Sequence, residues 1–162
     1  MKIMITIILS ALLLAGCAAT ETFEQVQDVY KSEALKSPID VQIQLPPDTG
    51  KTVLAGAQGR VYFCDGYEIA IETFTGGDLR RTVKSISGYD YENITIFETA
   101  VSPGMKRYEF VWTSAGAEGD QVGRSVIMDY GVYHYCVSMI ANSDEVGSLQ
   151  SVWQEVLQTI AV

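Results

Sequence analysis

Four side chains in this 162-residue chain stand out as carriers of covalent or acid–base chemistry. They are the three cysteines and the single histidine, namely Cys17, Cys64, Cys136 and His134. A thiol can be acylated, can oxidise to a disulfide outside the cytoplasm, or can act as a nucleophile where its pKa is lowered. The residues around each thiol indicate which of these reactions to expect.

The segment before Cys17 has the layout of an export signal. Lys2 is followed by an unbroken, mostly apolar run that ends at Gly16. The run is about fourteen residues long, shorter than the ~20 that a membrane-spanning helix needs. A basic start followed by a short apolar stretch is typical of a segment that directs export and is then removed.

The end of this segment, residues 14–17, reads Leu-Ala-Gly-Cys and resembles the lipobox of bacterial lipoproteins. In that motif the cysteine thiol accepts a diacylglyceryl group, and small residues before it let a peptidase reach the bond. The resemblance implies a signal peptide at 1–16, a lipidated tether at 17–22 and one folded domain at 23–162. Anchoring by two or three acyl chains is stable, because each buried CH₂ contributes ~0.8 kcal/mol.

The net charge of the chain limits the kinds of partner that we expect. The formal net charge is −9, and Lys2 leaves with the signal, so the mature chain carries −10. A surface this acidic argues against nucleic acid and against electrostatic adhesion to anionic lipid. We therefore expect lipid on Cys17 to hold the chain on the extracytoplasmic face of the cell membrane, or on an outer membrane where there are two. The expected partner is an unidentified protein or small molecule.

The other two cysteines fall in predicted strands. Outside the cytoplasm such a pair can oxidise, and a Cys64–Cys136 disulfide would close a loop of about seventy residues, worth roughly 4 kcal/mol. We favour this disulfide. The alternative is a pair of free thiols that pack as small apolar side chains.

His134 lies two residues from Cys136, on the same face of a predicted strand, and no third group is in place to orient it. A packed histidine is the simpler interpretation. With one histidine and no zinc or EF-hand spacing, we expect no metal and no cofactor. Tyr133 and Tyr135 share the opposite face and are the candidates for a binding surface, although packing under a helix explains them better.

The pattern of apolar residues predicts an α+β domain with a mainly antiparallel sheet. Helices are expected over Phe23–Leu35, from the N-cap Asp78 through about Ser87 with Gly88 at the C-terminal end, and from the N-cap Asn142 to the C-terminus. Strands are expected at Ile39–Leu45, Lys51–Ala55, Arg60–Cys64, Tyr67–Phe74, Ile94–Val101, Arg107–Thr113, Val122–Met128 and Val132–Ala141. Asp65-Gly66 predicts a hairpin turn between the third and fourth of these strands. The segment Ser114–Gln121 is interpreted as a mobile hairpin tip, and Glu68 and Glu72 as carboxylates facing water.

From Val61 to Ile160 the chain resembles small uncharacterised lipoproteins of gut-type, low-GC bacteria. The stretches that carry the resemblance are Tyr108–Trp112, Ala117–Arg124, Tyr133–Cys136 and Val152–Glu155. The layout is similar to the PsbP-like fold, an antiparallel sheet between N- and C-terminal helices. PsbP-like proteins serve mostly as accessory or assembly factors, so the resemblance implies a non-enzymatic binding or accessory module. The alternative is an envelope enzyme that uses carboxylates or His134.

The acyl anchor can be tested directly. Replacing Cys17 by Ala removes the only nucleophile of the motif, so the variant should lose all labelling by a clickable fatty acid fed to the cells. Cys64→Ala is the matched control and should keep the label. Labelling that persists in the Cys17 variant would show that lipid is attached elsewhere or that the motif is coincidental.

Overall fold

The computed structural model describes residues 37–54, 59–102, 104–117 and 119–162. The chain divides into Met1–Ser37 and Pro38–Val162, and the second unit is described here by itself. The predicted signal peptide, the tether and the helix at Phe23–Leu35 lie outside the described residues.

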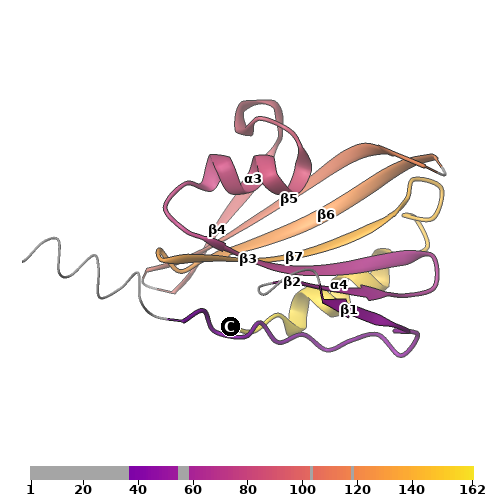
Figure 1. The fold of residues 1–162 in the computed structure, drawn as a ribbon. Coiled ribbons are helices and arrows are strands. Elements are labelled where there is room, and N and C mark those ends of the chain that lie inside the picture. The colour runs from indigo at the N-terminus through magenta and orange to yellow at the C-terminus, as the bar shows by residue number, and fades with distance from the viewer. Residues whose placement is uncertain (1–36, 55–58, 103, 118) are drawn as a thin grey trace, which may run out of the picture. The chain divides into compact units, whose positions relative to one another are not determined.

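The described residues form a seven-stranded sheet in which every pairing is antiparallel. The strands are β1 (Thr52–Leu54), β2 (Gly59–Phe63), β3 (Tyr67–Thr75), β4 (Ile96–Ser102), β5 (Met105–Gly116), β6 (Gly119–Asp129) and β7 (Tyr133–Asn142). Their order is β1-β2-β3-β7-β6-β5-β4 (Figure 1). Two meanders are therefore joined where β7 returns beside β3, after the chain has crossed from β3 to the far edge at β4.

The crossing carries α3 (Leu79–Ser87), followed by the short 3-10 helix η1 (Tyr91–Asn93). Asp78 caps α3 as predicted, since its Oδ1 accepts a hydrogen bond from the Arg81 backbone N–H at 3.2 Å. Gly88 ends the helix with φ at 77°, a left-handed conformation that favours glycine. The capping residues predicted from the sequence are thus confirmed at both ends.

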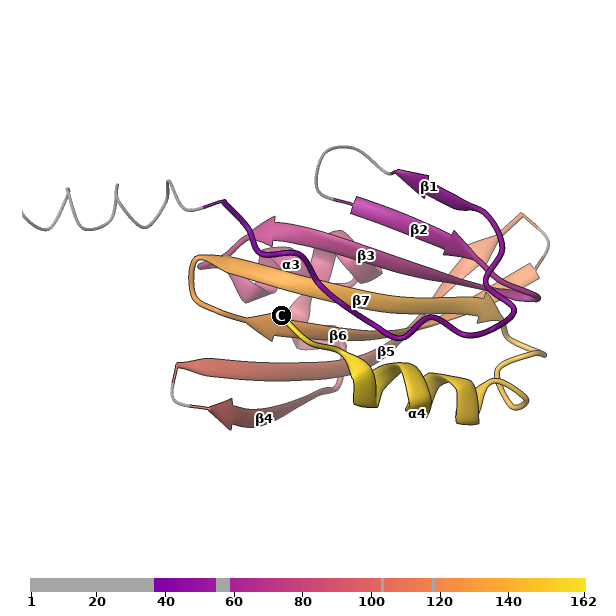
Figure 2. The ribbon, with the colours of Figure 1, turned by 90° about the horizontal axis from the view of Figure 1, so that it is seen from below.

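The second helix, α4 (Gln150–Thr159), packs on the opposite side of the sheet (Figure 2). The odd-numbered side chains of β7 point to the side of α4, called here the α4 face, and the even-numbered ones to the side of α3, the α3 face. Because both faces are covered, β7 is buried along most of its length. The predicted α+β class with an antiparallel sheet is confirmed, and α3 and α4 lie on opposite faces of the sheet.

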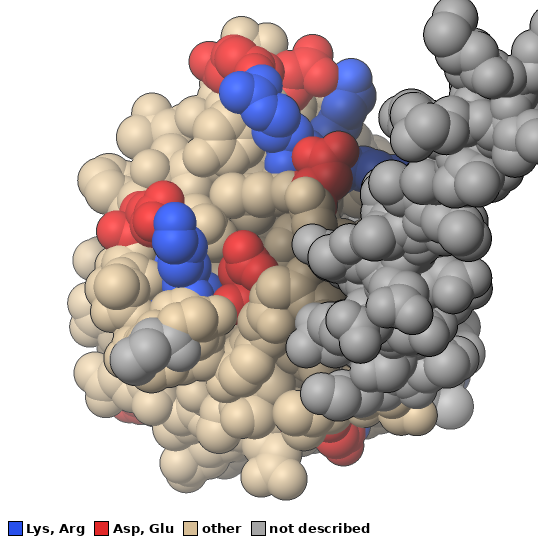
Figure 3. Space-filling model, turned by 90° about the vertical axis from the view of Figure 1, so that its left-hand side faces the viewer, with Lys and Arg blue, Asp and Glu red and all other residues tan. Residues whose placement is uncertain are grey.

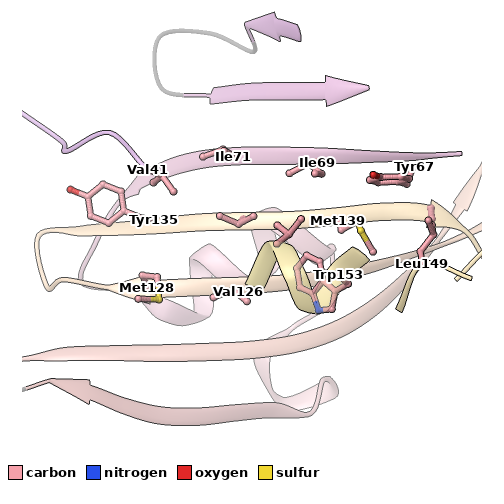
Figure 4. Packing of buried hydrophobic residues seen from close by; sticks show 13 residues of the cluster. Val41, Tyr67, Ile69, Ile71, Val126, Met128, Tyr135, Met139, Leu149 and Trp153 are labelled. Atoms are coloured by element: carbon pink, nitrogen blue, oxygen red, sulfur yellow. The ribbon is translucent and has the colours of Figure 1, made fainter. Parts of the chain in front are cut away.

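The larger core lies on the α4 face, where Trp153 of α4 points toward the strands (Figure 4). Its buried members come from α4, three strands and the segment before β1: Val41, Tyr67, Ile69, Ile71, Val126, Met128, Tyr135, Val137, Met139, Ala141, Leu149, Trp153 and Val156. Trp153 is only 2% exposed. Its burial makes α4 the main cover of this face.

The smaller core lies on the α3 face and is organised around Trp112. Its ring lies over Gly123 of the neighbouring strand, where a Cβ would come within 2.1 Å of the ring atom Cε2. The Trp112 Nε1–H donates to Ser125 Oγ at 2.9 Å, and Ser125 Oγ lies 2.7 Å from Ser138 Oγ. These hydrogen bonds satisfy buried polar atoms and fix the ring against the glycine.

The prediction of a strand at Ile39–Leu45 is wrong. This segment makes a single antiparallel bridge between Gln42 and Ala161, with both N–H···O distances at 2.9 Å. Only Val41 is well buried, whereas Ile39 is 58% exposed. Apolar and polar side chains do alternate in this segment, but its backbone pairs with the C-terminal tail and with no strand of the described sheet.

Two further boundaries differ from the prediction. Asn142 ends β7 and is not a helix cap, because its backbone continues the ladder opposite Gln121, and turns follow until α4 begins at Gln150. The expected mobile tip at 114–121 is shorter, since β5 and β6 stay paired as far as Gly116 and Gly119. Backbone hydrogen bonds extend a hairpin without needing apolar side chains, so the periodicity did not reveal the extra length of β5 and β6.

None of the described helices is long and apolar enough to span a bilayer.

The contact between Trp112 and Gly123 predicts a large effect from a small change. Gly123→Ala forces the ring to move away from its bond to Ser125, so the free energy of unfolding should fall by about 2–3 kcal/mol in urea titrations. Gly147→Ala is the control, because nothing lies within 4 Å of its added Cβ. Equal stability of the two variants would contradict this packing.

Candidate functional site

His134 is a packed residue in this structure. It is 1% exposed, and its Nδ1 lies 2.7 Å from the Thr82 hydroxyl of α3. Its Nε2 lies 3.6 Å from Asp129, whose Oδ1 also accepts the Gly131 N–H at 2.7 Å. The arrangement of Thr82, His134 and Asp129 ties α3 to the β6–β7 turn, and the burial of the ring closes it to a substrate.

Burial sets the protonation of this region. It lowers the pKa of His134, which the nearby carboxylates of Asp129 and Asp78 only partly offset. Burial also raises the pKa of the Cys136 thiol, with a smaller contribution from the charge of Glu72. A neutral imidazole and a protonated thiol are the forms expected of core residues, so the packed interpretation of His134 is confirmed.

The predicted Cys64–Cys136 disulfide is not formed, and both thiols are free. The backbone N–H of Cys64 bonds to Tyr67 O, whereas Cys136 pairs with Glu72, five residues further along β3. At about 3.4 Å per residue, Cys64 and Cys136 are therefore separated by about 17 Å along the direction of β3. A disulfide needs Cα atoms within about 7 Å of each other. The thiols also pack in different clusters, Cys64 on the α4 face and Cys136 on the α3 face.

The two candidate tyrosines, Tyr133 and Tyr135, differ in burial. Tyr135 is 2% exposed, stacks edge-on against Tyr130 with ring centroids 5.6 Å apart, and accepts the Ile39 N–H on its hydroxyl at 3.0 Å. Tyr133 is half-buried, with its ring 6.1 Å from that of Tyr135. Tyr135 is therefore a packing residue and holds the segment before β1 against the sheet.

A pocket of about 430 Å³ lies at the end of the sheet beyond α3, and its lining includes residues of the α3 face, such as Glu68 and Ile140, and residues of the α4 face, such as Cys64 and Tyr67. Two hairpins and the end of β7 enclose it. Its lining, called here the hairpin pocket, is Phe63, Cys64, Gly66, Tyr67, Glu68, Ala117, Gln121, Ile140, Ala141 and Asn142. Its size falls within the range of small-molecule sites, about 300–1,000 Å³.

Strand register brings the walls of this pocket together. Phe63 lies opposite Glu68, Glu68 opposite Ile140, and Ile140 opposite Gly123. One row of side chains thus runs from an aromatic ring through a carboxylate to an aliphatic floor. Gln121 opposite Asn142 adds two side-chain amides in the next row on the same face.

The β2–β3 turn is held in place from the other side of the sheet. Tyr67 donates its hydroxyl to Asp48 Oδ1 at 2.9 Å, and the Asp65 N–H donates to Oδ2 of the same carboxylate at 3.3 Å. Burial, together with the Asp48 carboxylate, raises the pKa of the Tyr67 hydroxyl, which therefore stays protonated. The hairpin that carries Phe63 and Glu68 is thereby anchored to the segment before β1.

Charge is distributed unevenly around the sheet. Figure 3 shows basic side chains lying beside acidic ones on the side of the molecule at the left of Figure 1. The ion pairs of the described residues around α3 and β4 include Arg80–Glu92, Lys84–Asp90 at 2.6 Å and Lys106–Glu98 at 2.8 Å. Among the described residues that line the hairpin pocket, by contrast, there is a carboxylate and no lysine or arginine.

The sequence prediction that Glu68 and Glu72 face water is corrected here. Both are half-buried on the α3 face, and burial raises the pKa of Glu72. The alternation of β3 was read correctly, but its second face was assumed to be open. The Asp65-Gly66 turn and the alternation of β3 were the available signals, and neither showed that β3 pairs with β7.

Comparison with known proteins adds a fold and no activity. The sequence matches no known protein family and no curated protein. A solved structure from Bacteroides thetaiotaomicron VPI-5482 is similar over 75% of this chain, with a TM-score of 0.52 and 12% identity. This chain spans 44% of that protein's length. The similarity shows a shared fold.

Two other solved structures are less similar. The protein of unknown function PA94 from Pseudomonas aeruginosa aligns with a TM-score of 0.47 and 11% identity, covering 79% of this chain and 86% of its own. LpqN of Mycobacterium tuberculosis, described as involved in cell envelope biogenesis, aligns with a TM-score of 0.46 and 13% identity, covering 75% of this chain and 83% of its own. No residue of the hairpin pocket acquires a role from these similarities.

The lowered pKa of His134 predicts a pH dependence of stability. Below about pH 6.5 the His134 imidazole is protonated in the unfolded chain but stays neutral in the folded chain, because its folded-state pKa is lowered. The free energy of unfolding should therefore fall as the pH is lowered from about 7.5 to about 5.5. The raised pKa of Glu72 acts with the opposite sign but is common to wild type and His134→Gln. The difference in slope between these two proteins in urea titrations isolates His134, and identical slopes would contradict its burial as a neutral ring.

Proposed function

We propose that this chain is a lipid-anchored extracytoplasmic lipoprotein of PsbP-like architecture that binds a small molecule in the hairpin pocket. The observation that carries the proposal is the mixed lining of this pocket, with an aromatic ring, a carboxylate, two amides and an apolar floor. Sites for small molecules are concave and mostly pre-formed, with a few convergent polar groups on an apolar surface. The hairpin pocket is concave and bounded by paired strands, and its lining is more polar than apolar, with an aliphatic patch at Ile140.

The position of the pocket also favours binding. Its floor is the end of β7, the central strand, and its walls are two hairpins whose backbones are fully paired up to their turns. Residues on paired strands hold their geometry better than residues on free loops. Side-chain positions are therefore set before a ligand arrives, which lowers the entropic cost of binding.

The remaining chemistry of the described residues supports a binding role over catalysis. His134 has both ring nitrogens directed at protein atoms, and Cys136 is 1% exposed. The carboxylate of the pocket, Glu68, has no histidine, serine or second catalytic group in its strand row. In this proposal the lipid on Cys17 holds the protein at the membrane surface. The hairpin pocket then retains a small molecule there.

A steric block tests this function. Ala117 lines the pocket at the tip of the β5–β6 hairpin, so Ala117→Trp should fill the opening. The full mature chain in non-ionic detergent would be titrated with three water-soluble fragments of one shape: 2-phenylethylammonium, 2-phenylethanol and phenylacetate. At least one fragment should shift the amide resonances of Phe63, Glu68 and Ile140, and the Trp variant should abolish the shifts.

Ala115→Trp is the matched control, because Ala115 lies on the same hairpin but on the opposite face of β5. This variant should bind the fragment as the wild type does. The proposal fails if no fragment of the three shifts the pocket resonances, or if the two Trp variants behave alike.

A further inference from the structure

We infer that the ligand of the hairpin pocket is an organic cation, an ammonium compound with an apolar body. This inference rests on the proposed function and adds the chemical class of the ligand. It follows from the juxtaposition of an unpaired carboxylate, an exposed aromatic ring and an apolar floor.

The carboxylate is that of Glu68. It is half-buried, and no hydrogen bond or ion pair joins it to another of the described residues. A cation in the pocket would give this half-buried carboxylate a charged partner. Several other carboxylates of the described residues already have partners, such as Glu98 with Lys106.

The aromatic ring is that of Phe63, which is 40% exposed although it lines the pocket. Phe63 and Glu68 are directly opposite in the register, which places their Cβ atoms about 5 Å apart on one face. An ammonium group between them meets a negative charge on one side and the negative face of a ring on the other. This pair is the chemical basis of cation recognition.

The charges near the hairpin pocket also favour a positively charged ligand. Glu145 reaches the rim, since a Cβ on Gly66 would lie 2.5 Å from its Oε2 atom. The net charge of −9 for the whole chain raises the local concentration of cations further. An anionic ligand would meet the Glu68 carboxylate here, without a lysine or arginine in the described lining.

The floor and the amides define the rest of the ligand. Ile140 offers an apolar surface, and the carbonyl oxygens of the Gln121 and Asn142 amides can accept N–H donors. No group of three potential metal ligands occurs among the described residues. A hydrated metal ion binds oxygen ligands and gains nothing from contact with an aromatic ring or an aliphatic surface. An alkyl- or arylammonium compound can contact both.

The three fragments of equal shape test the charge directly. By isothermal titration calorimetry on the full mature chain, 2-phenylethylammonium should bind at least about tenfold more tightly than 2-phenylethanol, and phenylacetate most weakly. Glu68→Gln keeps the shape of the side chain and removes its charge. In this variant the preference for the ammonium fragment over the alcohol should disappear.

Glu72→Gln is the matched control, because Glu72 lies on the same strand and face, half-buried, four residues from Glu68 and outside the pocket lining. It should keep the full preference for the cation. Equal binding of alcohol and ammonium by the wild type, tighter binding of phenylacetate, or an unchanged preference in Glu68→Gln would overturn the inference. Any of these results leaves a working small-molecule pocket, so the failure of the ligand class is distinct from the failure of the proposed function.

Discussion

The pairing of β3 with β7 is the constraint on which the rest of this domain depends. Nine residue pairs, from Tyr67 opposite Ala141 to Thr75 opposite Tyr133, join two meanders that are distant in sequence. Because side chains alternate along a strand, this one register assigns every residue of β7 to the α3 face or the α4 face. A slip by one residue would turn His134 and Cys136 toward α4 and would bring Tyr135 under α3.

The same register builds the pocket. It sets Glu68 opposite Ile140, and the hairpin of β2 and β3 brings Phe63 beside them. At one end of the α3 face, α3 covers the sheet and ties itself to β7 through Thr82 and His134. At the other end the two hairpins remain apart and leave a space of about 430 Å³. The packed contact between Thr82 and His134 and the hairpin pocket therefore lie at opposite ends of the sheet.

Much of the fold was predictable because its signals are local. The alternation of β3, the Asp65-Gly66 turn, the cap at Asp78 and the glycine at 88 depend on neighbouring residues alone, and the structure confirms each of them. The strand at Ile39–Leu45 and the helix start at Asn142 were wrong because their outcome depends on distant partners, the C-terminal tail and Gln121. The pairing of Cys64 with Cys136 failed for the same reason.

The candidate site was the part least accessible from sequence. Glu68 has the pattern of a solvated carboxylate on an alternating strand, and only the position of β7 and of the β5–β6 hairpin turns it into a pocket residue. The residues that looked chemical, His134 and Cys136, are core residues in the structure. The residues before Cys17 predict covalent attachment of lipid, and strand register determines which side chains line the hairpin pocket.

The central claim, that the hairpin pocket retains an organic cation at the membrane, is tested most directly on protein extracted from its own envelope. Native mass spectrometry of the wild-type chain should find a small molecule that is released on denaturation and ionises as an amine. The same preparation of Ala117→Trp should lack it, whereas Ala115→Trp should retain it. A wild-type chain that carries no such molecule, or an amine found equally in the Ala117→Trp variant, would contradict the claim.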